Sequence, residues 1–273
     1  MFSQHKNDIL NPTYIRMQKK IFSIGYGDVV PMRVRNVLII MMLVLLGSAL
    51  PCMAEVNEVD SNFDGKIDQW QYVDSQGKVE KIEHDGDFDG KVDQVEHFKD
   101  DKILEHVEFD RNKDGKMDHL QYYENGGKLS RVEKSSKFNG NYDWKEFFND
   151  SEKLTHIAID ENGDGKTNTT QFYDSSDKLS RIETDSNSNG KVDRWSHFRG
   201  NSILDRTAFD TTGNGKADQW QHYHEDQILK KADYDTNNDG KPDRWEHFDS
   251  SGKLLKTELD RNFDGKIDLT QKK

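Results

Sequence analysis

Oxygen-bearing side chains recur at alternate positions of a short acidic loop. The first copy runs Asp60-Ser-Asn62-Phe-Asp64-Gly-Lys66-Ile-Asp68. Calcium is a hard cation that takes roughly six to eight oxygen ligands. Oxygens at loop positions 1, 3 and 5, a glycine at position 6 for the sharp turn, a carbonyl at position 7 and an acid at position 9 surround one centre. The spacing therefore predicts a calcium site.

The loop is repeated at a fixed interval along the chain. Nine loops, each with glycine at position 6, follow one another every 25 residues without insertion or deletion. They begin at Asp60, Asp85, Asp110, Ser135, Asp160, Asp185, Asp210, Asp235 and Asp260. Tandem repetition at a constant period is typical of a repeat array rather than of a single globular core.

Seven of the nine loops keep Asp or Asn at positions 1, 3 and 5. The predicted metal ligands, with the residue at position 7 acting through its carbonyl, are Asp60, Asn62, Asp64, Lys66 and Asp68; Asp85, Asp87, Asp89, Lys91 and Asp93; Asp110, Asn112, Asp114, Lys116 and Asp118; Asp160, Asn162, Asp164 and Lys166; Asp185, Asn187, Asn189, Lys191 and Asp193; Asp235, Asn237, Asp239, Lys241 and Asp243; and Asp260, Asn262, Asp264, Lys266 and Asp268.

The loops are not predicted to be equal. The loop from Asp85 has four carboxylates and should bind most tightly, whereas Thr212 weakens the loop from Asp210. Ser135 and Lys137 should abolish the fourth site. The competing interpretation is that these are metal-free turns, since Asx and Gly residues favour turns by themselves. Seven loops bring like charges together, which costs electrostatic energy unless a cation is bound. This cost argues for calcium.

The loops resemble the Asp-x-Asn-x-Asp-Gly calcium loops of EF-hands, dockerins and thrombospondin type 3 repeats. The resemblance covers the nine loops, about a third of the chain after residue 54, and does not extend to their flanks. EF-hands place a bidentate Glu at position 12, which is mostly Gln here. We expect position 12 to contribute at most at Glu96, Glu146 or Glu246. The other half of the repeat resembles the hairpin repeats of bacterial surface proteins.

Two short aromatic or β-branched runs flank a Gly-bearing turn in each repeat, which predicts a β-hairpin. If Asp74 faces Lys78, then Val73 faces Val79, Gln71 faces Lys81 and Trp70 faces Ile82. The same register pairs Phe248 with Leu254, Glu246 with Lys256, Arg244 with Glu258, and Glu96 with His106. The predicted fold is all-β, with nine 25-residue hairpin repeats in an extended antiparallel meander or solenoid-like array, and the calcium loops along one edge.

In this register the apolar residues lie on both faces of the sheet. The Phe/Tyr–Leu pair near the tight turn points one way, and the Trp–Ile pair near the acidic loop points the other. Both faces must then be partly covered, either by coiling of the sheet or by packing against a second copy. An open ribbon and a closed form both remain consistent with the pattern.

The first 54 residues differ from the rest. A basic stretch from Met32 to Asn36 precedes an apolar run, Val37 to Leu50, and a small-residue segment ending at Ala54. This order predicts a signal peptide cleaved after Ala54, with an uncleaved anchor as the alternative and Met32 as a second candidate start. The predicted divisions are an extension and signal peptide at 1–54, a lead-in at 55–59 and the repeat domain at 60–273.

Composition supports an acidic, thinly packed exported chain. Hydrophobic residues make up 32% and charged residues 33% of the 273 residues. The net charge of -12 includes +4 from residues 1–54, which leaves -16 on the remainder. That charge excludes nucleic acid as a partner and favours cations. Cys52 is the only cysteine, so no disulfide holds the repeats.

No catalytic motif stands outside the repeat, and we expect no enzyme. The ring column containing His97 and His247 is interpreted as packing, because Tyr72 and Phe147 occupy it elsewhere. The expected function is a secreted, periplasmic or cell-surface calcium-binding protein with a structural or spacer role and no membrane span in the mature chain. The alternative is an adhesin or lectin that uses its tryptophan column to bind a glycan or a surface protein.

Overall fold

The computed structural model describes residues 55–100, 102–200 and 202–273, so the predicted N-terminal extension and signal peptide lie outside the described residues. This part of the chain forms eighteen strands and no helix. The strands are β1 (Glu55–Val59), β2 (Gln69–Val73), β3 (Val79–His84), β4 (Gln94–Lys99), β5 (Ile103–Phe109), β6 (His119–Glu124), β7 (Lys128–Lys134), β8 (Trp144–Phe148), β9 (Leu154–Ile159), β10 (Thr169–Tyr173), β11 (Leu179–Thr184), β12 (Arg194–Arg199), β13 (Ile203–Phe209), β14 (Gln219–Tyr223), β15 (Leu229–Tyr234), β16 (Arg244–Phe248), β17 (Leu254–Leu259) and β18 (Leu269–Lys272).

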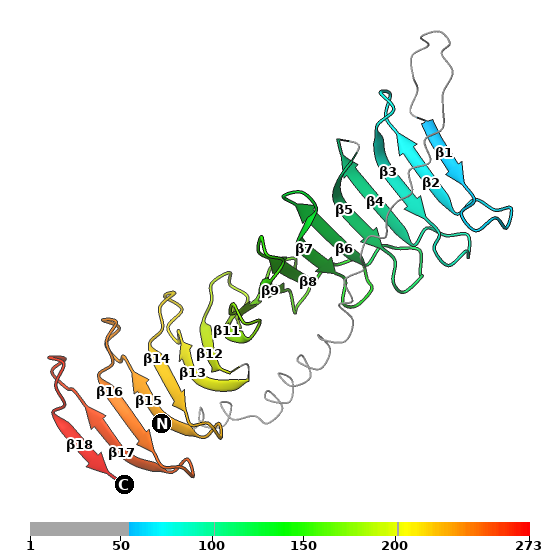
Figure 1. The fold of residues 1–273 in the computed structure, drawn as a ribbon. Helices are drawn as coiled ribbons and strands as arrows, with labels where there is room; N and C mark the ends of the chain where they lie inside the picture. The colour runs from blue at the N-terminus through cyan, green and yellow to red at the C-terminus, as the bar shows by residue number, and fades with distance from the viewer. Residues whose placement is uncertain (1–54, 101, 201) are drawn as a thin grey trace. The chain divides into compact units, whose positions relative to one another are not determined.

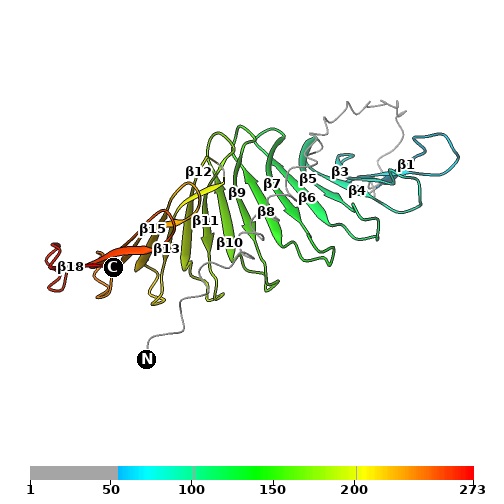
Figure 2. The ribbon, with the colours of Figure 1, turned by 90° about the horizontal axis from the view of Figure 1, so that it is seen from below.

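Each strand pairs antiparallel with the strands before and after it in the chain, which makes one open meander (Figure 1). Because every strand reverses direction, the nine acidic loops all leave one edge of the sheet and the eight tight turns leave the other. Figure 2 shows the same chain order from below. The all-β hairpin array is confirmed, and the predicted lead-in forms strand β1 against β2.

The tight turns have the predicted chemistry. In the first, the N–H of Asp74 donates to the carbonyl of Lys78 at 2.8 Å, and the N–H of Gly77 donates to the carbonyl of Asp74 at 2.9 Å. The Asp74 carboxylate also accepts hydrogen bonds from the N–H groups of Gln76 and Lys78, each at 2.8 Å. Gly77 has a φ of 78°, a conformation that glycine adopts without steric cost.

The predicted register is correct only next to the turn. Val73 faces Val79 as expected, but Tyr72 faces Lys81, so the predicted Gln71–Lys81 and Trp70–Ile82 pairs are wrong. A β-bulge places one extra residue, Glu80, in the return strand and shifts every later pair by one. All eight hairpins contain this bulge.

The same correction applies to the other predicted pairs. Phe248 does face Leu254, but Glu246 faces Thr257 and Arg244 faces Leu259. Glu96 likewise faces Val107, while His106 faces His97. The extra residue also changes which side chains share a face, because a slip of one residue moves a side chain to the opposite side of a strand.

One side of the sheet, called here the apolar face, carries most of the buried hydrophobic residues. In the first hairpin Val73, Val79 and Ile82 lie on it, and Trp70 lies on the opposite side, so the predicted Trp–Ile pairing across one face is wrong. Leu179 at 1% exposure and Val107 and Val132 at 4% are among its best-covered residues. Burial of one such side chain stabilises the fold by about 1.5–3 kcal/mol.

The opposite side, called here the ladder face, is covered by alternating rings and cations. Lys81 lies 4.1 Å from the centre of the Tyr72 ring. The Arg131 guanidinium lies 4.0 Å from the Tyr122 ring. Each cation–π contact contributes about 0.5–1 kcal/mol at an exposed site. Acids in the neighbouring row complete the layer, as in the 2.7 Å contact between Lys81 Nζ and Glu83 Oε1.

Candidate functional site

The acidic loop has the same backbone in all nine copies. Positions 4 and 6 are left-handed throughout; in the first loop Phe63 has a φ of 62° and Gly65 a φ of 89°. Position 6 is always glycine, which takes this conformation freely. Position 4 is a residue other than glycine in seven loops, at a cost of roughly 1–2 kcal/mol each. Strong local interactions must therefore hold the loop.

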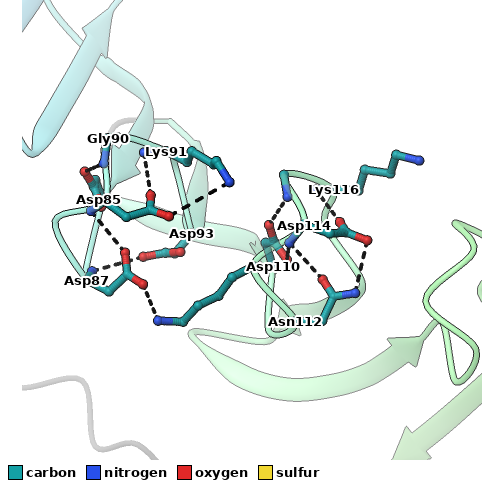
Figure 3. Close-up of polar contacts among 12 residues, drawn as sticks. Asp85, Asp87, Gly90, Lys91, Asp93, Asp110, Asn112, Asp114 and Lys116 are labelled. Carbon is teal, nitrogen blue, oxygen red and sulfur yellow. Dashed lines mark hydrogen bonds and ion pairs between the residues drawn. The ribbon is translucent and has the colours of Figure 1, made fainter.

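Those interactions turn the side chains of positions 1, 3 and 5 inward. The Asp60 carboxylate accepts hydrogen bonds from the N–H groups of Asp64 at 3.1 Å and Gly65 at 2.8 Å. Asn62 Oδ1 accepts from the N–H of Asp64 at 2.8 Å, and Asp64 Oδ1 accepts from the N–H of Lys66 at 2.9 Å. Figure 3 shows the same arrangement in the loops from Asp85 and Asp110.

These bonds separate two groups of loops. The bonds from position 6 to position 1 and from position 7 to position 5 occur in all nine. The bond from the N–H of position 5 to the side chain of position 3 occurs in the seven loops predicted to bind calcium. Lys137 and Thr212 occupy position 3 in the other two.

The residue at position 9 closes the base of the loop. Both carboxylate oxygens of Asp68 lie 3.1 Å from the backbone N of Ser61. Burial opposes ionisation of Asp68, but these hydrogen bonds and that from Asn62 hold the pKa of its carboxyl below its usual value. Asn168 Oδ1, which carries no charge, accepts the equivalent hydrogen bond from the N–H of Glu161 at 3.0 Å. The residue at position 9 therefore closes the loop, whether or not it also binds metal.

Neighbouring loops are joined to one another. The N–H of Asp85 donates to the carbonyl of Asp68 at 2.8 Å, and an equivalent bond links position 1 to position 9 of the preceding loop at each of the eight junctions. Side chains add contacts in some places, such as Asn162 Nδ2 to Ser188 Oγ at 3.0 Å. Each loop is therefore attached to the next by a backbone hydrogen bond.

The loop from Asp85 gathers the most charge. Carboxylate oxygens of Asp85, Asp87 and Asp89 lie within 4.8 Å of one another, the only all-acid group of this kind in the described residues. Asp93 lies apart from them and accepts from the N–H of Gly86 at 2.9 Å. Such a group of oxygens can hold a hard divalent cation.

The sequence did not predict one contact of this loop. The Lys113 ammonium, from position 4 of the next loop, forms an ion pair with Asp87. That hydrogen bond lowers the pKa of the Asp87 carboxyl and raises the pKa of Lys113. No signal in the sequence indicated this contact, because it depends on two neighbouring loops lying side by side.

The loop from Ser135 keeps its shape without an acid at position 1. Ser135 Oγ accepts hydrogen bonds from the N–H groups of Asn139 and Gly140, each at 3.2 Å. Phe138 and Gly140 have φ values of 53° and 84°, as in the other loops. Lys137 Nζ lies 3.9 Å from the Asp143 carboxylate. The turn therefore needs an oxygen at position 1 but not a charge.

The sequence suggested that the acids at position 12 face basic partners directly across the strands, but they do not. Glu146 pairs with Ile157 in the register, and its carboxylate contacts Lys134 Nζ on the other neighbouring strand at 2.6 Å. Glu96 lies 3.7 Å from His84 in the same way. These acids stay on the apolar face of the sheet, because the bulge shifts the pairing by one residue.

The tryptophan column lies on the ladder face and is half-buried. Trp70, Trp195, Trp220 and Trp245 all have intermediate exposure, and Glu83 lies directly opposite Trp70. Sugar-binding surfaces use aromatic faces that are open to solvent. The described residues contain no helix long and apolar enough to cross a membrane.

No protein-family model matches the chain, and no curated protein is recognisably similar to it in sequence. Several solved structures align weakly with the chain. Accessory secretory proteins 1, 2 and 3 of Streptococcus pneumoniae align at 14% identity over 38% of this chain and 19% of that chain, with a TM-score of 0.25. A GtfA/B complex bound to UDP and GlcNAc aligns at 12% identity over 65% of this chain and 38% of that chain, with a TM-score of 0.24.

A porin-like protein from Bacteroides uniformis aligns at 9% identity over 79% of this chain and 92% of that chain, with a TM-score of 0.22. The chain thus spans well under half of the first two proteins. None of these TM-scores reaches about 0.5, so the loops themselves carry the functional inference.

Proposed function

We propose that the chain is an exported calcium-binding repeat protein with a structural or spacer role at the cell envelope or exterior. The observation that carries this proposal is the loop from Ser135, which forms the same turn with a hydroxyl in place of the acid. Since the turn does not require the charge, the acids retained at position 1 of the other eight loops need another explanation. Binding of divalent cations supplies it.

In each of the seven loops the side-chain oxygens of positions 1, 3 and 5 would hold the ion, with the carbonyl of position 7 and water completing the shell. The position 9 residue keeps the loop closed and, where it is Asp, adds negative charge. Bound calcium would neutralise the loop acids and stiffen the loop, because carboxylates that repel one another are all attracted to the ion. About seven ions, at two charges each, would offset most of the -16 charge after residue 54.

A spacer role fits the described residues better than catalysis or glycan binding. The carboxylates of the loops are engaged in the same repeated hydrogen bonds, and no group of them departs from the repeat to form a distinct reaction centre. The half-buried tryptophans favour packing of the ladder face over stacking with a sugar. Export is proposed from the Val37 to Leu50 segment, and N-terminal sequencing of secreted or periplasmic material should start at Glu55.

Calcium titration of the chain from Glu55 tests the metal. We expect about seven ions with dissociation constants of roughly 10⁻⁴–10⁻³ M, the range of extracellular modules. The matched variants are Asp87→Lys, which copies Lys137 into a predicted site, and Asn139→Asp in the fourth loop, where Lys137 still blocks binding. Only the first should change the stoichiometry. Calcium-dependent retention on a glycan array would instead support the adhesin.

A further inference from the structure

The second hairpin places two histidines beside each other on the ladder face. His97 of β4 faces His106 of β5, and Glu108 lies two residues further along the same side of β5. In the other seven hairpins the residue opposite the ring is Lys or Arg, or the ring is Phe147 facing His156. Among the described residues, this hairpin alone brings two imidazoles and a carboxylate together.

The three ligand atoms are spaced as a small tetrahedral ion requires. Nε2 of His97 lies 3.0 Å from Oε1 of Glu108, and Nε2 of His106 lies 3.5 Å from the same oxygen. All three ligand atoms lie within 4.8 Å of one another. An ion with bonds of about 2.0–2.2 Å holds tetrahedral ligands about 3.4 Å apart. We propose that His97, His106 and Glu108 bind one transition-metal ion of the zinc type, separate from the calcium loops.

The chemistry of the ligands supports nitrogen-seeking metals over calcium. Nε2 of His97 is buried and makes no hydrogen bond despite its short distance to Glu108, so the contact is poorly aligned. Such a buried nitrogen calls for a partner, which a metal ion supplies. Imidazole suits zinc, copper and nickel, whereas calcium prefers oxygen.

The three ligand side chains are accessible to an ion, and a neighbouring carboxylate lies close to one of them. The side chains of His97, His106 and Glu108 are 29%, 22% and 28% exposed, so an ion can enter and water can be its fourth ligand. The second nitrogen of His106, Nδ1, lies 3.9 Å from the Glu105 carboxylate. A carboxylate near the free nitrogen of a metal-binding histidine orients the ring and raises its basicity.

Binding requires one rearrangement that can be observed. The two imidazole rings are stacked, with centroids 4.1 Å apart and planes 10° from parallel. Their lone pairs converge on one ion only when the rings turn about their terminal side-chain torsions, which vary broadly. The stacked pair should therefore open on metal binding, with changed ring resonances of His97 and His106 in NMR spectra.

The experiment uses the full chain in about 5 mM calcium, which occupies the oxygen loops. Cobalt(II) is the probe, since its visible absorption reports tetrahedral coordination, and zinc is then added as competitor. We expect one cobalt ion per chain with a tetrahedral spectrum, displaced by zinc. Substitutions are taken from the repeat itself: His97→Tyr as at Tyr72, His106→Arg as at Arg131, and Glu108→Ala as at Ala158.

Each substitution keeps a side chain that the ladder already accepts and should weaken binding by at least about 100-fold, since even outer contacts alter affinity about 10–100-fold. His247→Tyr is the control, because Lys256 faces His247 and supplies no second imidazole. It should leave binding unchanged. The proposal is overturned if His106→Arg binds cobalt as tightly as the parent chain, or if His247→Tyr weakens binding equally. Circular dichroism in calcium verifies that each variant is folded.

Discussion

The loop from Asp85 and the loop from Ser135 have the same backbone but different charge, because the first carries four carboxylates and one lysine and the second carries one carboxylate and one lysine. Position 1 of the first is a carboxylate that accepts from the N–H of Gly90 at 2.7 Å; in the second a hydroxyl accepts from Gly140 at 3.2 Å. Position 3 is Asp87 in the first and the cation Lys137 in the second. The difference separates what a loop needs to fold from what it needs to bind calcium.

Folding requires glycine at position 6, an oxygen at position 1 and a closing residue at position 9, which both loops have. Acids at positions 1, 3 and 5 add electrostatic repulsion that folding alone does not require. If the acids bind calcium, the two loops should respond differently to the ion. If they do not, the two loops should behave alike.

Calcium removal has the largest expected effect. At about 1 mM calcium and a dissociation constant of about 0.1 mM, one site stabilises the fold by about 1.4 kcal/mol, so seven sites contribute about 10 kcal/mol. Excess chelator should therefore lower the thermal midpoint steeply and increase the hydrodynamic radius of the chain from Glu55. An unchanged midpoint and radius would mean that the loops are metal-free turns.

Acid pH should destabilise the region beside the fourth loop. His119 faces Lys134, the residue before Ser135. Burial, with Arg111 and Lys134 nearby, lowers the pKa of His119 to about 3. The unfolded chain binds the proton near pH 6.5, so stability is lost as the pH falls from about 6.5 to about 3, by up to about 5 kcal/mol.

The measurement is the thermal midpoint between pH 7 and about pH 5, where carboxylates remain mostly ionised. His119→Gln, which copies Gln94 at the same repeat position, should flatten this dependence. A parent chain and variant with the same slope would show that His119 is not the titrating group. Comparison in calcium and in chelator separates this effect from metal binding.

The two loops also show what the sequence could predict. The constant spacing identified the array, the hairpins and the loop edge, because each depends on local turn chemistry that repeats in every copy. The register away from the turn could not be predicted from the alternation of apolar and polar residues. Glu80 is an ordinary exposed residue, and its type does not indicate a bulge. The position of Lys113 over Asp87 depends on two loops lying side by side.

The ladder face illustrates the same limit. The predicted register gave Lys81 the partner Gln71, and only the bulge pairs Lys81 with Tyr72 and brings its ammonium to 4.1 Å from the ring centre. The histidine column was interpreted as packing, and in the same column Phe147 stacks on His156 with ring centroids 4.3 Å apart. The second imidazole beside His97 could not be seen without the shifted register.

Converting the fourth loop into a binding loop should change stability by a smaller amount. Ser135→Asp with Lys137→Asn restores the acid and amide of the first loop. We expect one more bound calcium ion and about 1.4 kcal/mol of added stability at about 1 mM calcium. Limited proteolysis should nick the parent chain first within residues 135–141, and the variant should resist cleavage there.

The reverse substitution, Asp85→Ser with Asp87→Lys, is the matched control and should lose one ion and add a second early cleavage site at that loop. Repeat arrays are stabilised by local and nearest-neighbour contacts, so each effect should stay near the altered loop. Cleavage spread evenly over all nine loops would contradict this ranking by ligand charge.

The smallest effect concerns Lys113, whose ammonium forms an ion pair with Asp87. Calcium must displace that cation to use Asp87 as a ligand, so Lys113→Gln should tighten binding at the Asp85 loop. Exposed ion pairs are weak, so the gain in affinity should be no more than about 5-fold. Lys116→Gln is the control, since Figure 3 shows its ammonium extending away from the acids of its loop. Calcium titration at low ionic strength resolves the difference, and added salt should reduce it as screening increases. If Lys116→Gln tightens binding as much as Lys113→Gln, the gain reflects net charge and not the ion pair with Asp87.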